Sequence, residues 1–110
     1  MAVMHSNNSD FEAKIIIDRL QQYFKPYTPA RYVILIVDDP FERSYNFFFN
    51  IYRPPQLPHS IPLRRITLYD LEFLETIVGK IRQKYSFTFI FRNFKQQRWP
   101  SNFQLISKKG

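Results

Sequence analysis

The strongest constraint on the fold is a pair of β-favouring runs between Tyr32 and Tyr52. The first run, YVILIV at residues 32–37, is apolar at every position and rich in β-branched side chains. Both faces of such a strand need to be covered, so this run predicts a central strand. The second run, residues 45–52, alternates and predicts a strand with one core face and one half-polar face. Together the two runs predict a β-hairpin around which the chain is organised.

The outward-facing residues of the second run are the first candidates for a binding surface. Alternation along a strand places two amides and two rings together on its half-polar face. Such a face suits a partner, because the rings supply apolar contact area and the amides supply hydrogen bonds. The proline-rich segment that follows leaves the same end of the strand. The predicted partner-binding residues are Asn46, Phe48, Asn50, Tyr52, Pro54 and Pro55.

Two segments with the period of an amphipathic helix flank the hairpin. The first is predicted over residues 10–24, where the Ser9-x-x-Glu12 spacing matches a capping box. The second is predicted from about Asp70 to Tyr85, with an acid in the first turn, where the helix dipole favours negative charge. Each segment has one apolar stripe, which indicates that both helices pack on a sheet.

The segment between the hairpin and the second helix is dominated by proline. Residues 53–66 contain four prolines, a content that excludes a helix or an interior strand. We predict a stiff, extended loop over 53–66 that serves as a docking site or as a linker. A further strand is predicted over residues 86–94, and residues 103–106 fit a short edge strand.

These elements predict a single small α+β domain in the order α-β-β-α-β, with or without a last strand. The sheet is expected to be three- to four-stranded and largely antiparallel, with two helices packed on one face. The domain is predicted over residues 9–106, after a flexible leader at 1–8 and before a basic tail at 107–110. A chain of 110 residues is large enough for one core without a metal or a disulfide.

The missing residue types exclude several kinds of function. The chain has no cysteine, which excludes disulfides, thiolate metal sites and a cysteine nucleophile. It has only two glycines and no glycine-rich phosphate loop, and His5 and His59 are not spaced as metal ligands. We therefore expect a non-enzymatic protein with no metal and no cofactor. The sequence shows neither a membrane-spanning apolar run nor a secretory signal, so an intracellular, cytoplasmic location is expected.

Asp38 and Asp39, with Glu42 close by, are the strongest catalytic candidates, because neighbouring carboxylates can hold Mg²⁺. The predicted order of elements resembles part of the restriction-type nuclease core, a family that places an acid-x-Lys element on the following strand. Residues 47–51 contain neither an acid nor a lysine. We therefore predict that these acids form a solvated hairpin turn, with a Mg-dependent nuclease as a remote alternative.

Positive charge is concentrated in the second half of the chain. Residues 1–52 carry five basic and six acidic side chains, whereas residues 53–110 carry eleven and three. Basic groups neutralise phosphates and aromatic rings stack on bases, so the second half is the predicted nucleic-acid interface. The predicted contact residues are Arg53, Arg64, Arg65, Lys80, Arg82, Lys84, Arg92, Lys95, Arg98 and Trp99.

The aromatic run at residues 87–91 resembles a strand of an RNA-recognition module, although the glycine-flanked pattern of that family is missing. Because positive charge and aromatic rings are concentrated in the second half of the chain, the predicted function is that of a small basic nucleic-acid-binding or nucleic-acid-associated regulatory protein. The alternative is a protein-interaction module. It would act as an adaptor, an inhibitor or a homodimer through the proline-rich loop and the aromatic sheet face.

Overall fold

The structure, a computed structural model, describes residues 8–26 and 29–106. It contains two helices and four strands in the order α1-β1-β2-β3-α2-β4. Their bounds are Ser9–Tyr23 for α1, Arg31–Asp39 for β1, Ser44–Tyr52 for β2, His59–Ile66 for β3, Leu71–Lys84 for α2 and Thr88–Arg92 for β4. The predicted basic tail, and all of the predicted leader except Asn8, lie outside the described residues.

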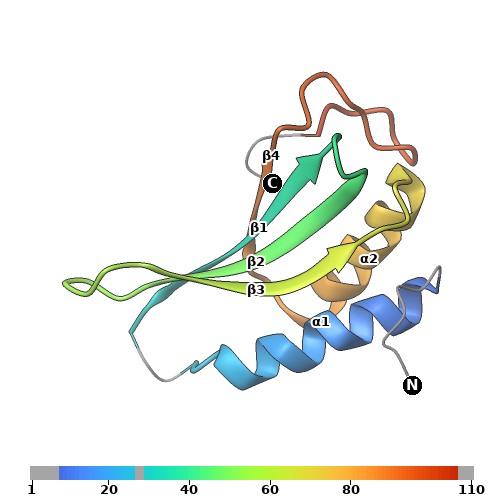
Figure 1. Cartoon of the computed structure of the whole chain (residues 1–110). Coiled ribbons are helices and arrows are strands. Elements are labelled where there is room, and N and C mark those ends of the chain that lie inside the picture. The colour runs from blue at the N-terminus through green and yellow to red at the C-terminus, as the bar shows by residue number, and fades with distance from the viewer. Residues whose placement is uncertain (1–7, 27–28, 107–110) are drawn as a thin grey trace.

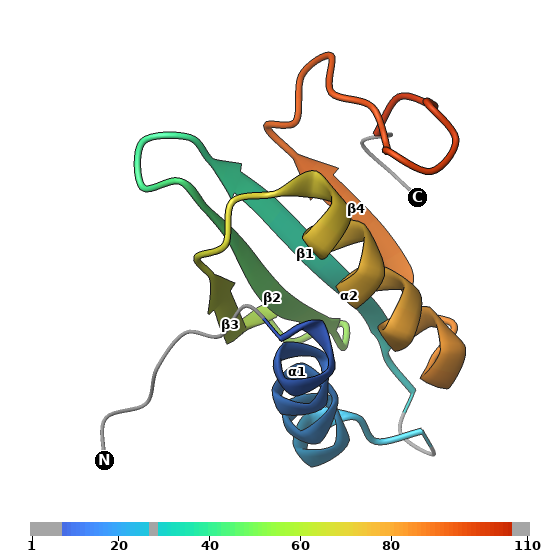
Figure 2. The same ribbon diagram turned by 90° about the vertical axis from the view of Figure 1, so that its right-hand side faces the viewer.

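Both helices lie on one face of a single four-stranded sheet with the order β3-β2-β1-β4 (Figures 1 and 2). This arrangement confirms the predicted α+β class and the placement of the helices. The pairing of β1 with β2 and of β2 with β3 is antiparallel, whereas β4 runs parallel to β1. The sheet is therefore mixed. Strand β4 can run parallel to β1 because α2 carries the chain back to the end of the sheet at which β1 starts.

The β1–β2 hairpin forms as predicted, with a four-residue connection at residues 40–43. Asp39 stabilises this turn, since its Oδ1 accepts hydrogen bonds from the backbone N–H groups of Phe41 and Glu42, both at 3.1 Å. The predicted turn began at Asp38. The structure instead pairs Asp38 with Tyr45 and Asp39 with Ser44, so both acids belong to β1.

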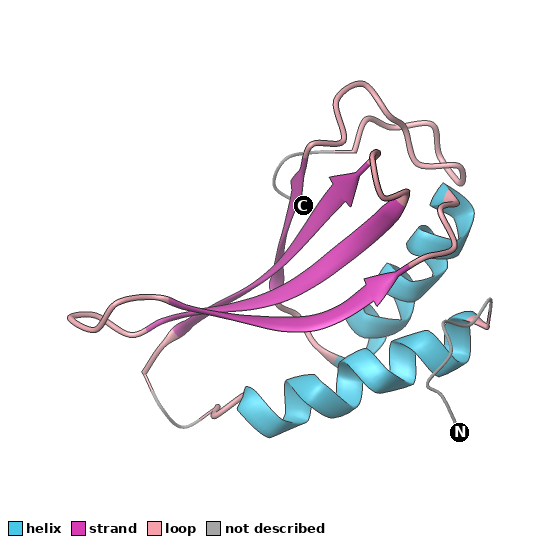
Figure 3. Cartoon of the chain, viewed as in Figure 1, coloured by secondary structure: helices cyan, strands magenta, loops and turns pink. Residues whose placement is uncertain are grey.

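The proline-rich loop is shorter than predicted, because residues 59–66 form strand β3 beside β2. The strand tolerates Pro62 for two reasons. It lies at the edge of the sheet, and Leu63 is inserted as a bulge between the residues that pair with Phe47 and Phe48. Only residues 53–58 remain a loop. They form the tip of a hairpin that extends beyond the helices (Figure 3).

The core lies between the helices and the face of the sheet that they cover. Alternate residues of the strands point into it, including Ile34, Ile36, Phe47, Phe49 and Phe89, each at most 1% exposed. The apolar stripes predicted for the two helices are the faces that pack against them. Aromatic contacts join the elements, as in the perpendicular packing of Phe91 on Phe94 at 5.8 Å.

A buried ion pair joins α1 to β3. The Glu12 carboxylate is 1% exposed and binds the Arg64 guanidinium through two contacts, Nε to Oε1 at 2.7 Å and Nη2 to Oε2 at 3.1 Å. The hydrogen bond to Glu12 raises the pKa of Arg64 above its ordinary value.

The N-terminal cap of α1 lies one residue earlier than predicted. The side chain of Asn8, in place of Ser9, accepts from the N–H groups of the first turn.

Candidate functional site

The face of the sheet opposite the helices brings several of the predicted site residues together. We call it the open face, because no described helix or strand lies over it (Figures 1 and 2). Its side chains follow from the strand pairings and the alternation along each strand. They are Arg31, Val33, Leu35, Val37 and Asp39 from β1, Asn46, Phe48, Asn50 and Tyr52 from β2, Ser60, Pro62 and Arg65 from β3, and Thr88, Ile90 and Arg92 from β4.

The register of the strands arranges the open face in bands across the sheet. One band consists of Arg92, Val37, Asn46 and Arg65. The next consists of Ile90, Leu35, Phe48 and Pro62, and the third of Thr88, Val33, Asn50 and Ser60. A cationic band with an amide thus borders an apolar band with a ring at its centre, which in turn borders a polar band.

The middle of the open face is hollowed. A depression of about 330 Å³ lies over Leu35, with Phe48 and Asn46 on one side and Arg92 on another. Leu35 is 7% exposed, whereas the larger Phe48 is half-buried and presents part of its ring to solvent. The depression therefore combines an apolar base with the Arg92 cation, the Asn46 amide and the Asp39 carboxylate in its lining.

The charge on the open face is positive. Arg31 and Arg92 are exposed, and no carboxylate among the described residues pairs with either. The guanidinium of Arg31 lies 5.1 Å from the ring centroid of Tyr52. Arg65 pairs with Glu42 at 2.7 Å, but both side chains are about half exposed, so this pair is weak.

The other predicted basic residues lie elsewhere. Arg53 leads into the hairpin loop, where its Nη2 donates to the Tyr32 hydroxyl at 3.3 Å. Lys80 pairs with Asp10 of α1, and Lys84 lies in the last turn of α2. Arg64 is buried against Glu12 and is unsuited to contact a nucleic acid, so we leave it out of the interface. The remaining predicted residues lie in α2 and in residues 93–106, and they are Arg82, Lys95, Arg98 and Trp99.

Arg31 is a cation of the open face that was not among the predicted contact residues. Its position would have been found by extending the alternation of β1 two residues back from Val33. The predicted residues Arg65, Arg92, Asn46, Phe48, Asn50 and Tyr52 share this face. Pro54 and Pro55 lie beyond it, in the exposed hairpin loop.

The two adjacent acids do not form a catalytic pair, because neighbouring residues of a strand point to opposite faces. Asp38 is 2% exposed, and its carboxylate accepts hydrogen bonds from the Tyr69 hydroxyl and from Gln97 Nε2, both at 2.6 Å. The Asp39 carboxylate points to the opposite face of the sheet, where it accepts hydrogen bonds from the backbone of the hairpin turn. Within residues 8–26 and 29–106, no three His, Cys, Asp or Glu side chains are grouped to hold a metal ion.

Residues 93–106, which we call the C-terminal loop, are anchored to β1 through Asp38. Gln97 binds the Asp38 carboxylate, and Asn93 Nδ2 donates to the Asp38 backbone oxygen at 2.9 Å. Three non-glycine residues of the loop, Asn93, Lys95 and Phe103, have positive φ angles of 70°, 54° and 59°. Such a backbone persists only where surrounding contacts hold it in place. The edge strand predicted at 103–106 is reduced to a single bridge between Arg98 and Leu105.

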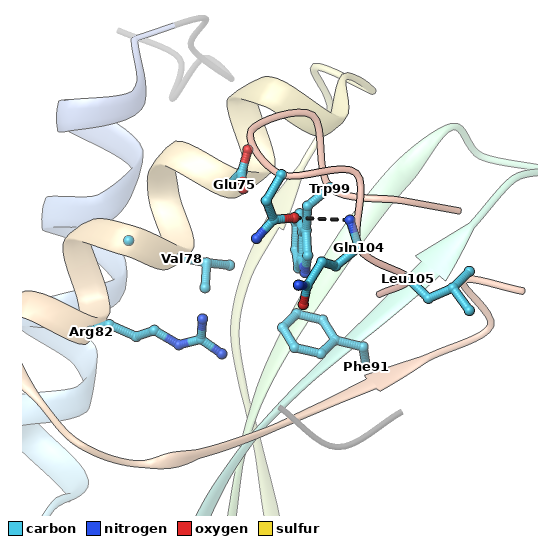
Figure 4. Close-up of a pocket in the computed structure, with 9 residues that line it drawn as sticks. Glu75, Val78, Arg82, Phe91, Trp99, Gln104 and Leu105 are labelled. Atoms are coloured by element: carbon cyan, nitrogen blue, oxygen red, sulfur yellow. Dashed lines mark hydrogen bonds between the residues drawn. The ribbon is translucent and has the colours of Figure 1, made fainter. Parts of the chain in front are cut away.

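A cavity of about 440 Å³ lies between α2 and the C-terminal loop (Figure 4). The helix contributes Glu75, Val78, Gly79 and Arg82. The loop contributes Trp99, Asn102, Gln104 and Leu105, and β4 contributes Phe91. The Trp99 and Phe91 rings meet nearly at right angles at 5.3 Å. Glycine inside a helix lowers its stability by about 1 kcal/mol relative to alanine. Gly79 therefore weakens α2 where the helix lines the cavity.

Two tyrosines beside Asp38 have perturbed ionisation. Burial, followed by the nearby Asp38 charge, raises the pKa of Tyr45 far above its ordinary value. Burial and the hydrogen bond to Asp38 raise the pKa of Tyr69 to about 12. The folded state thus favours the neutral phenol of Tyr69.

We expect the stability of the protein to fall between pH 10 and 12 because of Tyr69. The neutral phenol contributes fully below its unfolded pKa of about 10, and this contribution is lost as the pH rises through the folded pKa of about 12. The measurement is urea unfolding across this pH range together with a titration of tyrosinate absorbance. In Tyr69→Phe, the absorbance step near pH 12 should shrink. An unchanged step would show that the Tyr69 phenol ionises at a different pH.

Comparisons of the chain with protein-family models, with curated proteins and with solved structures give no match. Neither of the described helices has the length and apolar character needed to cross a membrane.

Proposed function

We propose that this protein binds single-stranded nucleic acid on the open face of its sheet. The observation that supports this most directly is the placement of two guanidinium groups, Arg31 and Arg92, that pair with no described carboxylate, on a face that carries the partly exposed rings of Phe48 and Tyr52. Cations neutralise phosphates, and rings stack on bases without regard to their sequence. Asp39 is the acid on this face, and its carboxylate accepts hydrogen bonds from the backbone of the turn at 40–43.

A single strand suits this face better than a duplex. The bases of a duplex are stacked on one another, whereas an unpaired base leaves its ring face free to stack on Phe48 or Tyr52. Asn46 and Asn50 flank Phe48 on β2 and offer amides to base edges. Ser60 donates to Asn50 Oδ1 at 2.7 Å, which leaves the Asn50 amide nitrogen available as a donor.

Charge favours an anionic polymer over a second copy of the chain. If two open faces met, the arginines of one copy would oppose those of the other across an interface that excludes water. Like charges in such a contact cost several kcal/mol. The chain as a whole carries a formal charge of +7, which also favours encounter with an anionic polymer.

The test is fluorescence anisotropy with labelled single-stranded RNA and DNA over a range of salt concentrations. Phe48→Ala should weaken binding by about 1–3 kcal/mol, roughly fivefold to 150-fold, because one stacking contact is lost. Arg92→Gln should weaken binding to all sequences alike and reduce the slope of log affinity against log salt by about 0.7, which corresponds to one phosphate contact.

Two matched substitutions serve as controls. Phe41→Ala removes a ring that is 95% exposed on the hairpin turn, and Lys14→Gln removes a cation on the helix side of the molecule. Both should bind as the unmodified protein does. The proposal fails if no oligonucleotide binds at low salt, or if Phe48→Ala binds as tightly as Phe41→Ala.

A second candidate function is the binding of a protein partner through the hairpin loop at 53–58. Leu57 is 83% exposed in this loop, beside a tight turn in which the Gln56 N–H donates to the Arg53 carbonyl oxygen at 2.8 Å. This contact would depend on apolar burial more than on charge. A protein partner that is retained as salt rises, and that is lost on substitution of Leu57, would identify this function in place of nucleic-acid binding.

A further inference from the structure

We propose that the cavity between α2 and the C-terminal loop binds one nucleotide, with its base between the loop and the helix and its phosphate at Arg82. This site goes beyond the proposed function, because it lies on the other side of β4. Phe91 points into the cavity, whereas Ile90 and Arg92 belong to the open face. The cavity volume, about 440 Å³, lies within the range of small-molecule sites.

The inner surface of the cavity suits a flat ring. Figure 4 shows Trp99 and Phe91 on the side of the loop and β4, with Val78 and Arg82 directed toward them from α2. The two aromatic rings meet at 79°, so a planar ligand that stacks on the half-buried Trp99 ring lies nearly perpendicular to the Phe91 ring. Both arrangements are favourable for aromatic groups.

Side-chain amides at the mouth of the cavity supply hydrogen bonds. Asn102 Oδ1 accepts from the Gln104 backbone N–H at 3.0 Å, which leaves its amide nitrogen as a donor. The side-chain amide of Gln104 hydrogen-bonds to no other described residue and so retains both a donor and an acceptor. Paired donors and acceptors of this kind recognise the edges of nucleobases.

Arg82 supplies a positive charge that no acid of the described chain neutralises. Its guanidinium lies 4.8 Å from the ring centroid of Phe89, and no carboxylate within the described residues pairs with it. The one acid of the cavity, Glu75, is already engaged, since its carboxylate accepts from the backbone N–H and the hydroxyl of Ser101. Arginine binds phosphate through two parallel hydrogen bonds.

Gly79 keeps the helix wall of the cavity open. Its φ angle is not positive, so the backbone does not require glycine here. Packing does not require it either, because a Cβ built at this position meets no atom within 4 Å. A residue that disfavours the helix, with neither backbone nor packing as a reason, is explained by the space that it leaves for a ligand.

The experiment uses Trp99, the one tryptophan of the chain, as a fluorescent reporter. Adenosine monophosphate is added to the full-length protein, with adenosine and inorganic phosphate in parallel. We expect saturable quenching by the nucleotide, binding at least tenfold weaker for adenosine, and none detectable for phosphate alone. An oligonucleotide with a free 5′ phosphate is the further arm, which distinguishes a free nucleotide from the end of a chain.

Three variants decide the outcome. Gly79→Leu should fill the cavity and weaken binding at least tenfold without lowering the melting temperature, since the added side chain enters open space. Arg82→Gln should bring the affinity for the nucleotide down to that for adenosine. Phe48→Ala should bind the nucleotide normally, which separates this site from the open face. Normal binding by Gly79→Leu, loss of binding in Phe48→Ala, or absence of quenching in every arm would overturn the proposal.

Discussion

Replacing Glu12 by alanine is expected to lower the free energy of unfolding by about 3–5 kcal/mol. The substitution leaves the Arg64 guanidinium, whose side chain is 8% exposed, buried without its anionic partner. A buried charge that loses its partner keeps the full cost of its removal from water. The contact also joins α1 to the edge strand β3, so its loss weakens the packing of the helix on the sheet.

Urea unfolding of three variants tests this expectation. Asp18→Ala, on the same helix, breaks an exposed pair with Lys14 and should cost about 0.3–0.5 kcal/mol. Combining Glu12→Leu with Arg64→Met removes both buried charges and should recover much of the stability that Glu12→Ala loses. Equal costs for Glu12→Ala and Asp18→Ala would contradict the burial of the Glu12–Arg64 pair.

Asp38→Ala is expected to cost about 2–4 kcal/mol, because a hydrogen bond to a charged group contributes about 1.5–3 kcal/mol. The substitution deprives both the Tyr69 hydroxyl and the Gln97 amide of their acceptor. It also removes the side chain that anchors the C-terminal loop to β1. The Trp99 and Ile106 N–H groups, which bond within this loop, should therefore exchange their hydrogens faster.

The neighbouring Asp39 is the matched control. Its carboxylate accepts two hydrogen bonds in an exposed turn, so Asp39→Ala should cost about 1 kcal/mol and leave hydrogen exchange in the loop unchanged. Urea unfolding and hydrogen exchange, measured on both variants, provide the comparison. If Asp39→Ala proved as costly as Asp38→Ala, the anchoring role of Asp38 would be wrong.

Local patterns were sufficient to predict both helices and the central hairpin. The apolar residues of the helices and of β2 recur with the period of each element, and the core of β1 is an unbroken apolar run. The prediction failed at β3. Four prolines between residues 53 and 66 indicate a loop, and the edge position that tolerates Pro62 is a property of the assembled sheet. The parallel partner of β4 was likewise unpredictable, since pairing between distant strands leaves no local pattern.

The same limit applies to the candidate sites. Alternation along β2 placed Asn46, Phe48 and Asn50 on one face without any tertiary information. Arg64 and Arg65 were both predicted to contact nucleic acid, but consecutive residues of a strand point to opposite faces, so one is buried and the other is exposed. The cavity beside Trp99 depends on the path of the C-terminal loop, which long-range contacts to Asp38 determine.

The parallel pairing of β1 with β4 governs the order in which the chain can complete its sheet during synthesis. The hairpin partner of β1 follows it directly along the chain, whereas the partner on its other side is separated from it by two further strands and a helix. The contact of Asn93 with Asp38 closes a separation of 55 residues. Until residues 88–92 have left the ribosome, one edge of the most apolar strand has no partner within its own chain, and its N–H and C=O groups face water or other molecules.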